Sequence, residues 1–133
     1  MQTNKIIISS AMRPVIIYSG SEQIYVKGSR SSIGGQLEED RVEKNFIDQE
    51  FQLKKGDIVY MFSDGYPDQM GGERRKKFMT KPFKKLLLDM QDESMEKQEE
   101  ILDQTIEDWK AYPDDKGEGY EQMDDITIIG IKF

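Results

Sequence analysis

The sequence contains neither histidine nor cysteine among its 133 residues. Zinc, copper and haem sites usually need imidazole or thiolate ligands, and thiol catalysis needs cysteine, so the composition argues against all of these chemistries. A disulfide framework is absent for the same reason. Any metal bound here must be held by oxygen atoms, which favours magnesium, manganese or calcium.

Long apolar runs are also missing from this sequence. No apolar stretch approaches the roughly 20 residues needed to cross a bilayer, so we expect no membrane contact by this segment. No N-terminal segment has the layout of a signal peptide. Together with the missing cysteines, these features favour a cytoplasmic location, and they are compatible with a parent protein that carries a sensor or a membrane-anchored module.

Positive charge is in short supply, with 19 lysines and arginines against 26 acidic residues and a net charge of −7. Nucleic-acid binding depends largely on neutralising phosphates, so the charge argues against a nucleic-acid partner. The chain is 36% apolar and 34% charged, with a mean hydropathy of −0.73. These values and the length fit one soluble domain with one core over residues 1–133.

The first half of the chain predicts strands joined by turns, because its apolar runs are short and rich in β-branched residues. The predicted strands span residues 5–10, 15–18, 23–27, 45–53 and 58–62. A hairpin turn is expected at residues 19–22, and a loop at 28–36. In the strand that follows this turn, Ile24 and Val26 should share one face. The run at 58–62 is apolar on both faces, which is typical of a buried central strand.

The second half predicts helices followed by a closing strand. Residues 66–80 are expected to be irregular, and Thr80 is expected to cap a helix with Pro82 in its first turn. A second helix is predicted over 94–110, a mobile linker over 114–120 and a strand over 125–133. Apolar residues recur at helical spacing in both helices: Phe83, Leu86, Leu87 and Met90 in the first, and Met95, Ile101, Leu102, Ile106 and Trp109 in the second. Strands followed by helices predict an α+β fold.

Two acidic stretches lie at the ends of predicted strands. Ser63-Asp64-Gly65 follows one hydrophobic strand, and Asp124-Asp125 enters another. The first stretch is also common in ordinary turns, and the second is compatible with a solvated strand start. Carboxylates beside buried strands are costly unless a cation neutralises them. If the strands are neighbours, the two stretches could meet, and a bridging cation would then relieve their repulsion.

Residues 62–68 and 123–132, together with the Ala11–Pro14 turn and the Ser32–Gly35 loop, carry a family resemblance. From about residue 4 to its end, the sequence resembles the C-terminal part of the catalytic domain in the bacterial stage II sporulation E type branch of the metal-dependent protein phosphatases (PPM family). The resemblance implies an α+β fold, a β-sandwich flanked by helices (αββα) that is incomplete at the N-terminus. It also implies hydrolysis of phosphoserine or phosphothreonine on a phosphorylated regulatory protein, with two Mn²⁺ or Mg²⁺ ions.

The same resemblance implies roles for particular residues. Asp64 and Asp124 match metal ligands of the family, and Gly65, Asp68 and Asp125 match positions that flank the site.

Three arginines are candidate substrate contacts. Arg13 lies in the turn of residues 11–14, where a structural role is an equally good reading. Arg74 and Arg75 begin a basic run at 74–77 that fits either a phosphate contact or a solvated loop face.

One family motif has no counterpart in this sequence. The family's first metal-binding aspartate lies in an upstream Asp-Gly-x-Gly-His-Gly type of motif, whereas here no aspartate precedes Asp40 and histidine is absent. We therefore expect an incomplete two-metal site and little or no activity from this chain alone. The sequence is either a piece of a longer protein, which we favour, or a degenerate relative. The alternative function is a non-catalytic regulatory or protein-interaction module that retains the fold.

If the upstream part of the fold is missing, some apolar surface should be exposed. The upstream elements would have covered apolar strand residues, so Ile6, Ile8, Ile16 and Tyr60 are expected to be exposed. Exposed apolar surface of this kind predicts self-association.

Overall fold

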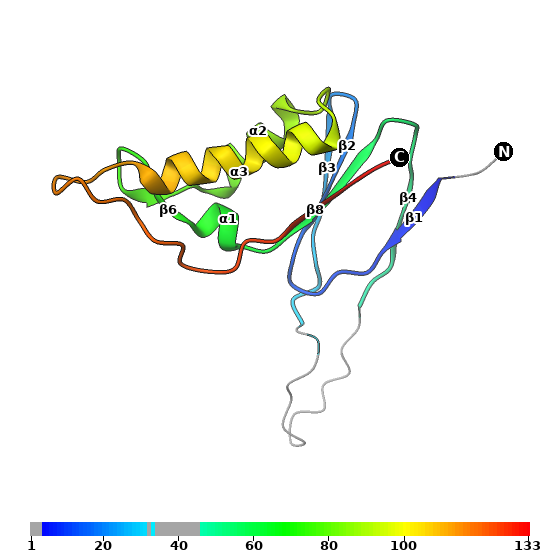
Figure 1. The fold of residues 1–133 in the computed structure, drawn as a ribbon. Helices are drawn as coiled ribbons and strands as arrows, with labels where there is room; N and C mark the ends of the chain where they lie inside the picture. The colour runs from blue at the N-terminus through cyan, green and yellow to red at the C-terminus, as the bar shows by residue number, and fades with distance from the viewer. Residues whose placement is uncertain (1–3, 32, 34–45) are drawn as a thin grey trace, which may run out of the picture. The chain divides into compact units, whose positions relative to one another are not determined.

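The computed structural model describes residues 4–31, 33 and 46–133 (Figure 1). The chain divides into two compact units. The first comprises Met1–Phe62 with Gly130–Phe133, and the second comprises Ser63–Ile129. Ser32, Gly34 and Gly35 of the sequence-predicted loop lie outside the described residues.

The first unit is built from antiparallel strands. One pair joins β1 (Lys5–Ile8) to β4 (Gln49–Gln52). A four-stranded sheet has the order β3-β2-β5-β8. Its strands are β2 (Val15–Ser19), β3 (Glu22–Val26), β5 (Ile58–Phe62) and β8 (Ile128–Lys132). The position of β5 between β2 and β8 confirms the predicted central strand.

The connection between β2 and β3 is the predicted hairpin turn. Ser19 pairs with Glu22, which leaves a two-residue loop of Gly20 and Ser21. Gly20 has φ +59°, a conformation that glycine adopts without steric cost. The predicted strand at 45–53 is shorter than expected, since β4 covers only Gln49–Gln52.

The core of the first unit is a cluster of buried apolar residues, most of which lie in its strands. This cluster consists of Ile8, Val15, Ile17, Val26, Leu53 and Val59, with Ile6, Ile24 and Phe51 packed against it. Tyr18 and Tyr60, which alternate with core residues along β2 and β5, are also buried, and their rings meet edge to face at 5.9 Å. β2 and β5 are therefore buried on both faces along most of their length, although Met61 of β5 is exposed.

The predicted exposure of four strand residues is wrong. Ile8, Ile16 and Tyr60 are 8%, 0% and 1% exposed, and Ile6 is partly buried. The reason is that these side chains pack within the described chain, so they do not form an uncovered patch. Self-association itself stays a prediction.

The second unit contains α1 (Gly65–Asp68), β6 (Met70–Gly71), β7 (Lys76–Lys77), α2 (Thr80–Asp89) and α3 (Met95–Ala111). The prediction of an irregular stretch over residues 66–80 is wrong, because a one-turn helix and a small β6–β7 hairpin occupy most of it. A Cβ added at Gly71 would lie 2.1 Å from the Trp109 carbonyl oxygen. A Cβ added at Gly72 would lie 2.3 Å from the Trp109 ring. The two glycines therefore allow the hairpin to lie directly against Trp109.

The two long helices occur where the sequence predicts them. Thr80, however, is the first residue of α2 and not its cap; the cap position is Met79, which has φ +80° and makes no capping hydrogen bond with its side chain. α3 has the expected type of cap, since the Ser94 side chain accepts a hydrogen bond from the Lys97 amide. Phe83 and Leu87 of α2, and Leu102 and Ile106 of α3, are buried as predicted.

The segment after α3 makes several polar contacts, and its predicted mobility stays a prediction. Asp114 Oδ1 accepts hydrogen bonds from the amides of Lys116 (2.8 Å) and Glu118 (2.9 Å), and Asp114 Oδ2 pairs with Arg75 at 3.0 Å. β8 begins at Ile128, three residues later than predicted. Among the described residues, no helix combines the length and apolar character needed to cross a membrane.

Candidate metal centre

Ser63, the residue after β5, fastens the two acidic stretches together. Its amide donates to the Thr127 carbonyl (2.9 Å), and its hydroxyl donates to the Asp125 carbonyl (2.8 Å). The Thr127 amide in turn donates to the Ser63 hydroxyl at 3.0 Å. The chain leaving β5 is thus bonded to the chain entering β8, while the convergence of the Asp64 and Asp124 carboxylates stays a prediction. Asp125 and Thr127, which precede β8, form these bonds with Ser63. This bonding explains why β8 starts later than predicted.

Gly65 allows the closest backbone approach at this junction. A Cβ built on Gly65 would lie 2.3 Å from the Asp125 carbonyl oxygen and 2.9 Å from the Asp125 carbonyl carbon. Real side chains do not occupy such positions, so residue 65 must be glycine for the two stretches to touch. This contact gives a structural reason for the Asp-Gly pair.

Asp64 occupies the cap position of α1 and is half-buried. Its backbone carbonyl accepts a hydrogen bond from the Asp68 amide at 2.9 Å, which closes the single helical turn. Its carboxylate makes no capping hydrogen bond to the helix. The turn therefore fixes the backbone of Asp64 without using its side chain as a cap.

Asp124 and Asp125 lie on the other side of the junction, and both are exposed. Asp124 Oδ1 accepts a hydrogen bond from the Asp125 amide at 2.8 Å, which orients the Asp124 carboxylate. The Asp124 carbonyl accepts from Gln122 Nε2 at 3.0 Å. Asp125 contributes its backbone carbonyl to the bond with Ser63.

Asp68 forms an ion pair with Lys77 at 3.2 Å, between the end of α1 and β7. About half of each of these two side chains is exposed, so the pair is screened by solvent and stabilises the fold little. One residue of the basic run at 74–77, Lys77, is therefore paired with an acidic residue next to the junction.

The three candidate arginines occupy different surroundings. Arg13 is exposed in the first unit, and its amide donates to the Ala11 carbonyl at 2.6 Å. Arg74 is exposed in the turn between β6 and β7. Arg75 donates from Nε to the Tyr120 hydroxyl (2.9 Å), pairs with Asp114, and lies 4.8 Å from the centre of the Tyr120 ring. Arg75 therefore ties the hairpin to the segment after α3.

Arg75 and Asp114 each shift the pKa of the other. The hydrogen bonds that Arg75 donates to the Tyr120 hydroxyl and to the Asp114 carboxylate raise the pKa of Arg75. The pKa of Asp114 is lowered, first by the hydrogen bond from the Glu118 amide and then by the bond from Arg75. Both groups keep their charges at neutral pH.

Two residues near the junction were missed by sequence reasoning. Tyr66 is buried, donates from its hydroxyl to the Leu102 carbonyl at 2.9 Å and packs its ring on Phe78 and Phe83. Gln69 is 1% exposed, and its amide reaches the backbone of residues 121 and 123. No periodicity or motif distinguishes these two positions, because their partners lie 36 to 54 residues away in sequence.

The donor atoms at the junction suit a hard cation in kind but are too few to enclose one. Magnesium and manganese prefer carboxylate oxygens, and such ions typically take about six oxygen ligands. Over residues 4–31, 33 and 46–133, no group of three or more Asp, Glu, His or Cys side chains is arranged to hold a metal ion. The described residues therefore supply carboxylates of the kind that a hard-metal site uses, but they do not complete such a site by themselves.

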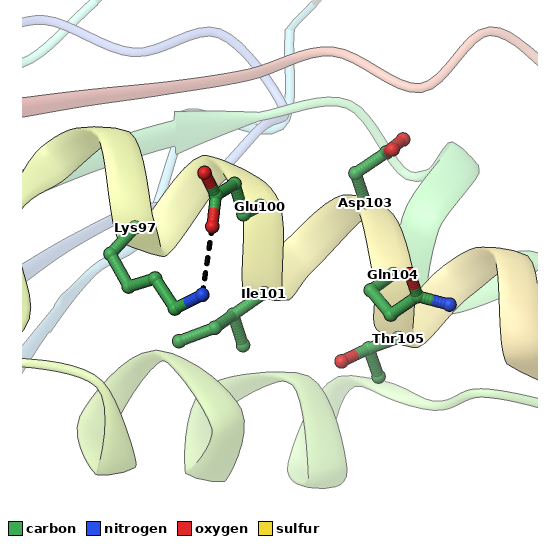
Figure 2. A pocket seen from close by; sticks show the side chains of 6 residues that line it. All are labelled: Lys97, Glu100, Ile101, Asp103, Gln104 and Thr105. Carbon is green, nitrogen blue, oxygen red and sulfur yellow. Dashed lines mark hydrogen bonds and ion pairs between the residues drawn. The ribbon is translucent and has the colours of Figure 1, made fainter.

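A separate pocket of about 490 Å³ lies on α3. Figure 2 shows its six lining side chains: Lys97, Glu100, Ile101, Asp103, Gln104 and Thr105. Lys97 and Glu100 form an ion pair at 2.8 Å across one turn of the helix. None of the lining residues belongs to the acidic junction, so this pocket is distinct from the candidate metal centre.

The comparisons with known proteins agree with the resemblance. The sequence model of the family described as "Stage II sporulation protein E (SpoIIE)" matches residues 1–133, and the chain belongs to that family. A search of curated proteins gives no match.

Solved structures match the fold. The SiaA-PP2C domain of Pseudomonas aeruginosa superposes with a TM-score of 0.81 at 25% identity, covering 98% of this chain and 47% of that one. The PP2C phosphatase domain of SpoIIE from Bacillus subtilis, with a fragment of its regulatory domain, gives 0.62 at 19% identity, covering 97% and 33%. A manganese-presoaked SpoIIE phosphatase domain gives 0.56 at 18% identity, covering 96% and 49%. This confirms the predicted α+β phosphatase fold, and the chain spans less than half the length of these three structures.

Proposed function

We propose that this chain is part of a metal-dependent phosphatase that hydrolyses phosphoserine or phosphothreonine on a regulatory protein. Membership in the SpoIIE family supports this function. The observation that carries it is the Ser63 junction, which brings the Asp64 turn against the backbone of Asp125. A domain with a purely structural role has little need for two carboxylate stretches at such a point.

In this proposal Asp64 and Asp124 bind Mn²⁺ or Mg²⁺. Asp64 lies at the cap position before the short helix α1, and Asp124 is oriented by the amide of Asp125. When bound, such ions lower the pKa of a coordinated water and offset charge on the phosphoryl oxygens. Gly65 and Ser63 contribute by holding the two ligand-bearing segments together.

The remaining metal ligands would come from outside the described residues. Because the described part of the chain holds no three-carboxylate group, we expect weak metal binding and little or no turnover by the 133 residues alone. A longer protein that includes an upstream acidic motif should bind manganese more tightly and hydrolyse a phosphoserine peptide.

Manganese titration of aspartate variants tests this proposal. We expect Asp64→Asn and Asp124→Asn each to weaken Mn²⁺ binding to the 133-residue chain by roughly tenfold, since each removes a charged ligand. Asp92→Asn is the matched control, because Asp92 is an exposed aspartate in the turn between α2 and α3. Calorimetry or manganese-induced NMR line broadening gives the affinities. Unchanged binding in both Asp64→Asn and Asp124→Asn would refute the assignment.

A second candidate function is a non-catalytic regulatory or interaction module. The absence of a three-carboxylate group among the described residues favours it. The two functions differ in one measurement, which is phosphatase activity of the longest natural protein that contains this chain. Manganese-dependent activity that is abolished by Asp64→Asn supports the phosphatase, and inactivity of that protein supports the module.

A further inference from the structure

We propose that Gln69 is a positioning residue for Asp124. Its buried side-chain amide holds the segment of residues 121–123, so that Asp124 stays beside the turn that carries Asp64. The part of this inference that concerns metal binding rests on the proposed function. The part that concerns the backbone of residues 121–123 does not.

The side-chain amide of Gln69 forms hydrogen bonds with three backbone groups. Nε2 donates to the carbonyls of Met70 and Glu121, each at 3.0 Å, and Oε1 accepts from the Met123 amide at 3.2 Å. The side chain is 1% exposed, so water does not replace these partners readily. One side chain therefore holds the segment at two points, one residue and three residues before Asp124.

The 121–123 segment depends on such a partner because it belongs to neither a helix nor a strand. It lies between two anchored residues. The Tyr120 amide donates to the Lys110 carbonyl (2.7 Å), and the Asp125 carbonyl accepts from the Ser63 hydroxyl (2.8 Å). Between these anchors the Gln69 amide does what a neighbouring strand does elsewhere, since it pairs both a carbonyl and an amide of the segment.

Gln69 is itself held rigidly next to the Asp64 turn. Gln69 follows the last residue of α1, and its backbone N–H donates to the Tyr66 carbonyl at 3.3 Å. Its own carbonyl accepts from the Phe78 amide (2.9 Å) and from Trp109 Nε1 (3.1 Å). A change in the Gln69 side chain therefore affects the 121–123 segment more than it affects α1.

The chemistry of the side chain is specific to glutamine. Methionine has a similar length but offers neither the two donors nor the acceptor. Glutamate keeps an acceptor for Met123, but when ionised it would face two carbonyl oxygens with a negative charge. Both substitutions should release residues 121–123 while preserving the volume of the buried site.

The test compares Gln69→Met with Gln98→Met in the full 133-residue chain. Gln98 is also 1% exposed and lies in the same unit, and its Nε2 donates to the carbonyl of Glu93, which precedes α3. We expect hydrogen exchange of the Met123 amide to become at least about fivefold faster in Gln69→Met, from the loss of one buried hydrogen bond. Gln98→Met should leave the exchange of this amide unchanged. Circular dichroism checks that both variants are folded, and Gln69→Glu replaces Gln69→Met if the latter is not.

A second readout concerns metal binding. In the unsubstituted chain, Mn²⁺ should broaden the NMR signals of the Gly65 and Asp125 amides over the same concentration range. In Gln69→Met, broadening at Asp125 should need at least about threefold more Mn²⁺, while broadening at Gly65 shifts less. A general loss of stability would move both signals together and would not produce this split.

The outcomes separate the two proposals. An unprotected Met123 amide in the unsubstituted chain, unchanged exchange in the Gln69 variants, or an equal effect of Gln98→Met would overturn the positioning role. Absence of manganese broadening in the unsubstituted chain would count against the metal site, and Met123 exchange would still decide the role of Gln69. Faster exchange at Met123 together with the split in broadening supports both.

Discussion

Replacing Gly65 with alanine tests whether the contact between the two acidic stretches governs stability. The added Cβ would lie 2.3 Å from the Asp125 carbonyl oxygen, 2.9 Å from its carbon and 3.2 Å from Ile126 Cγ1. The nearest atoms belong to the backbone, which cannot rotate away as a side chain can. The junction must open by several tenths of an ångström or more for the methyl group to fit.

The magnitude follows from two opposing effects. Gly65 is the first residue of α1, and alanine is favoured over glycine in a helix by up to about 1 kcal/mol. Overpacking a tight site typically costs about 1–3 kcal/mol, and here the neighbour is backbone. We expect Gly65→Ala to lower the free energy of unfolding by about 2 kcal/mol. For a chain of this size the melting temperature should fall by roughly 7 °C.

Thermal and urea denaturation, followed by circular dichroism, measure this change. Gly20→Ala serves as the control, because Gly20 has nothing within 4 Å of an added Cβ and its φ of +59° produces only local strain. We expect Gly65→Ala to weaken Mn²⁺ binding as well, by separating Asp64 from Asp124, and Gly20→Ala to leave that binding unchanged. A neutral or stabilising Gly65→Ala would refute the reasoning, because helix propensity alone predicts that result.

Two further predictions concern the surface of the protein. The lowered pKa of Asp114 means that its contribution to stability is present above the ordinary aspartate pKa and is lost as the pH falls through the lowered value; the difference in urea midpoint between the unsubstituted chain and Asp114→Asn should therefore be largest at neutral pH and shrink in acid, and a difference that is constant with pH would contradict this. Ile129 and Ile131 of β8, an edge strand in the sheet order, and Phe133 just after it are 37–49% exposed. We expect this edge to mediate self-association, so Ile131→Lys should reduce the mass measured by light scattering, whereas a monomeric unsubstituted chain would show the prediction to be wrong.

The local pattern of residues was sufficient to predict most of the elements. Runs of β-branched residues indicated β2 and β5, and the turn at 19–22 was readable from its glycine. The helical spacing of Leu102 and Ile106 indicated the buried face of α3. These features depend on neighbours within a few residues along the chain, which is why they can be read without the fold. The junction was expected from two acidic stretches at strand ends.

Other features depended on contacts between distant residues. The β6–β7 hairpin was missed because Gly71 and Gly72 fit against Trp109, which lies nearly forty residues later. The ion pair between Arg75 and Asp114 leaves no local signal in the sequence, since the two residues are far apart along the chain. A buried glutamine and an exposed one look the same in sequence, so Gln69 became visible only through its bonds to residues 121 and 123.

The sequence by itself determined which residue types are available for chemistry. With no histidine and no cysteine, carboxylates are the acidic metal ligands that this chain offers, and their places beside hydrophobic strands follow from the order of residues. Only the tertiary structure decided how closely the stretches approach, because Ser63 and Gly65 act on backbone atoms some sixty residues away. Hydrogen bonds and steric contacts act over a few ångströms in space, and the folded chain alone brings these groups within that range.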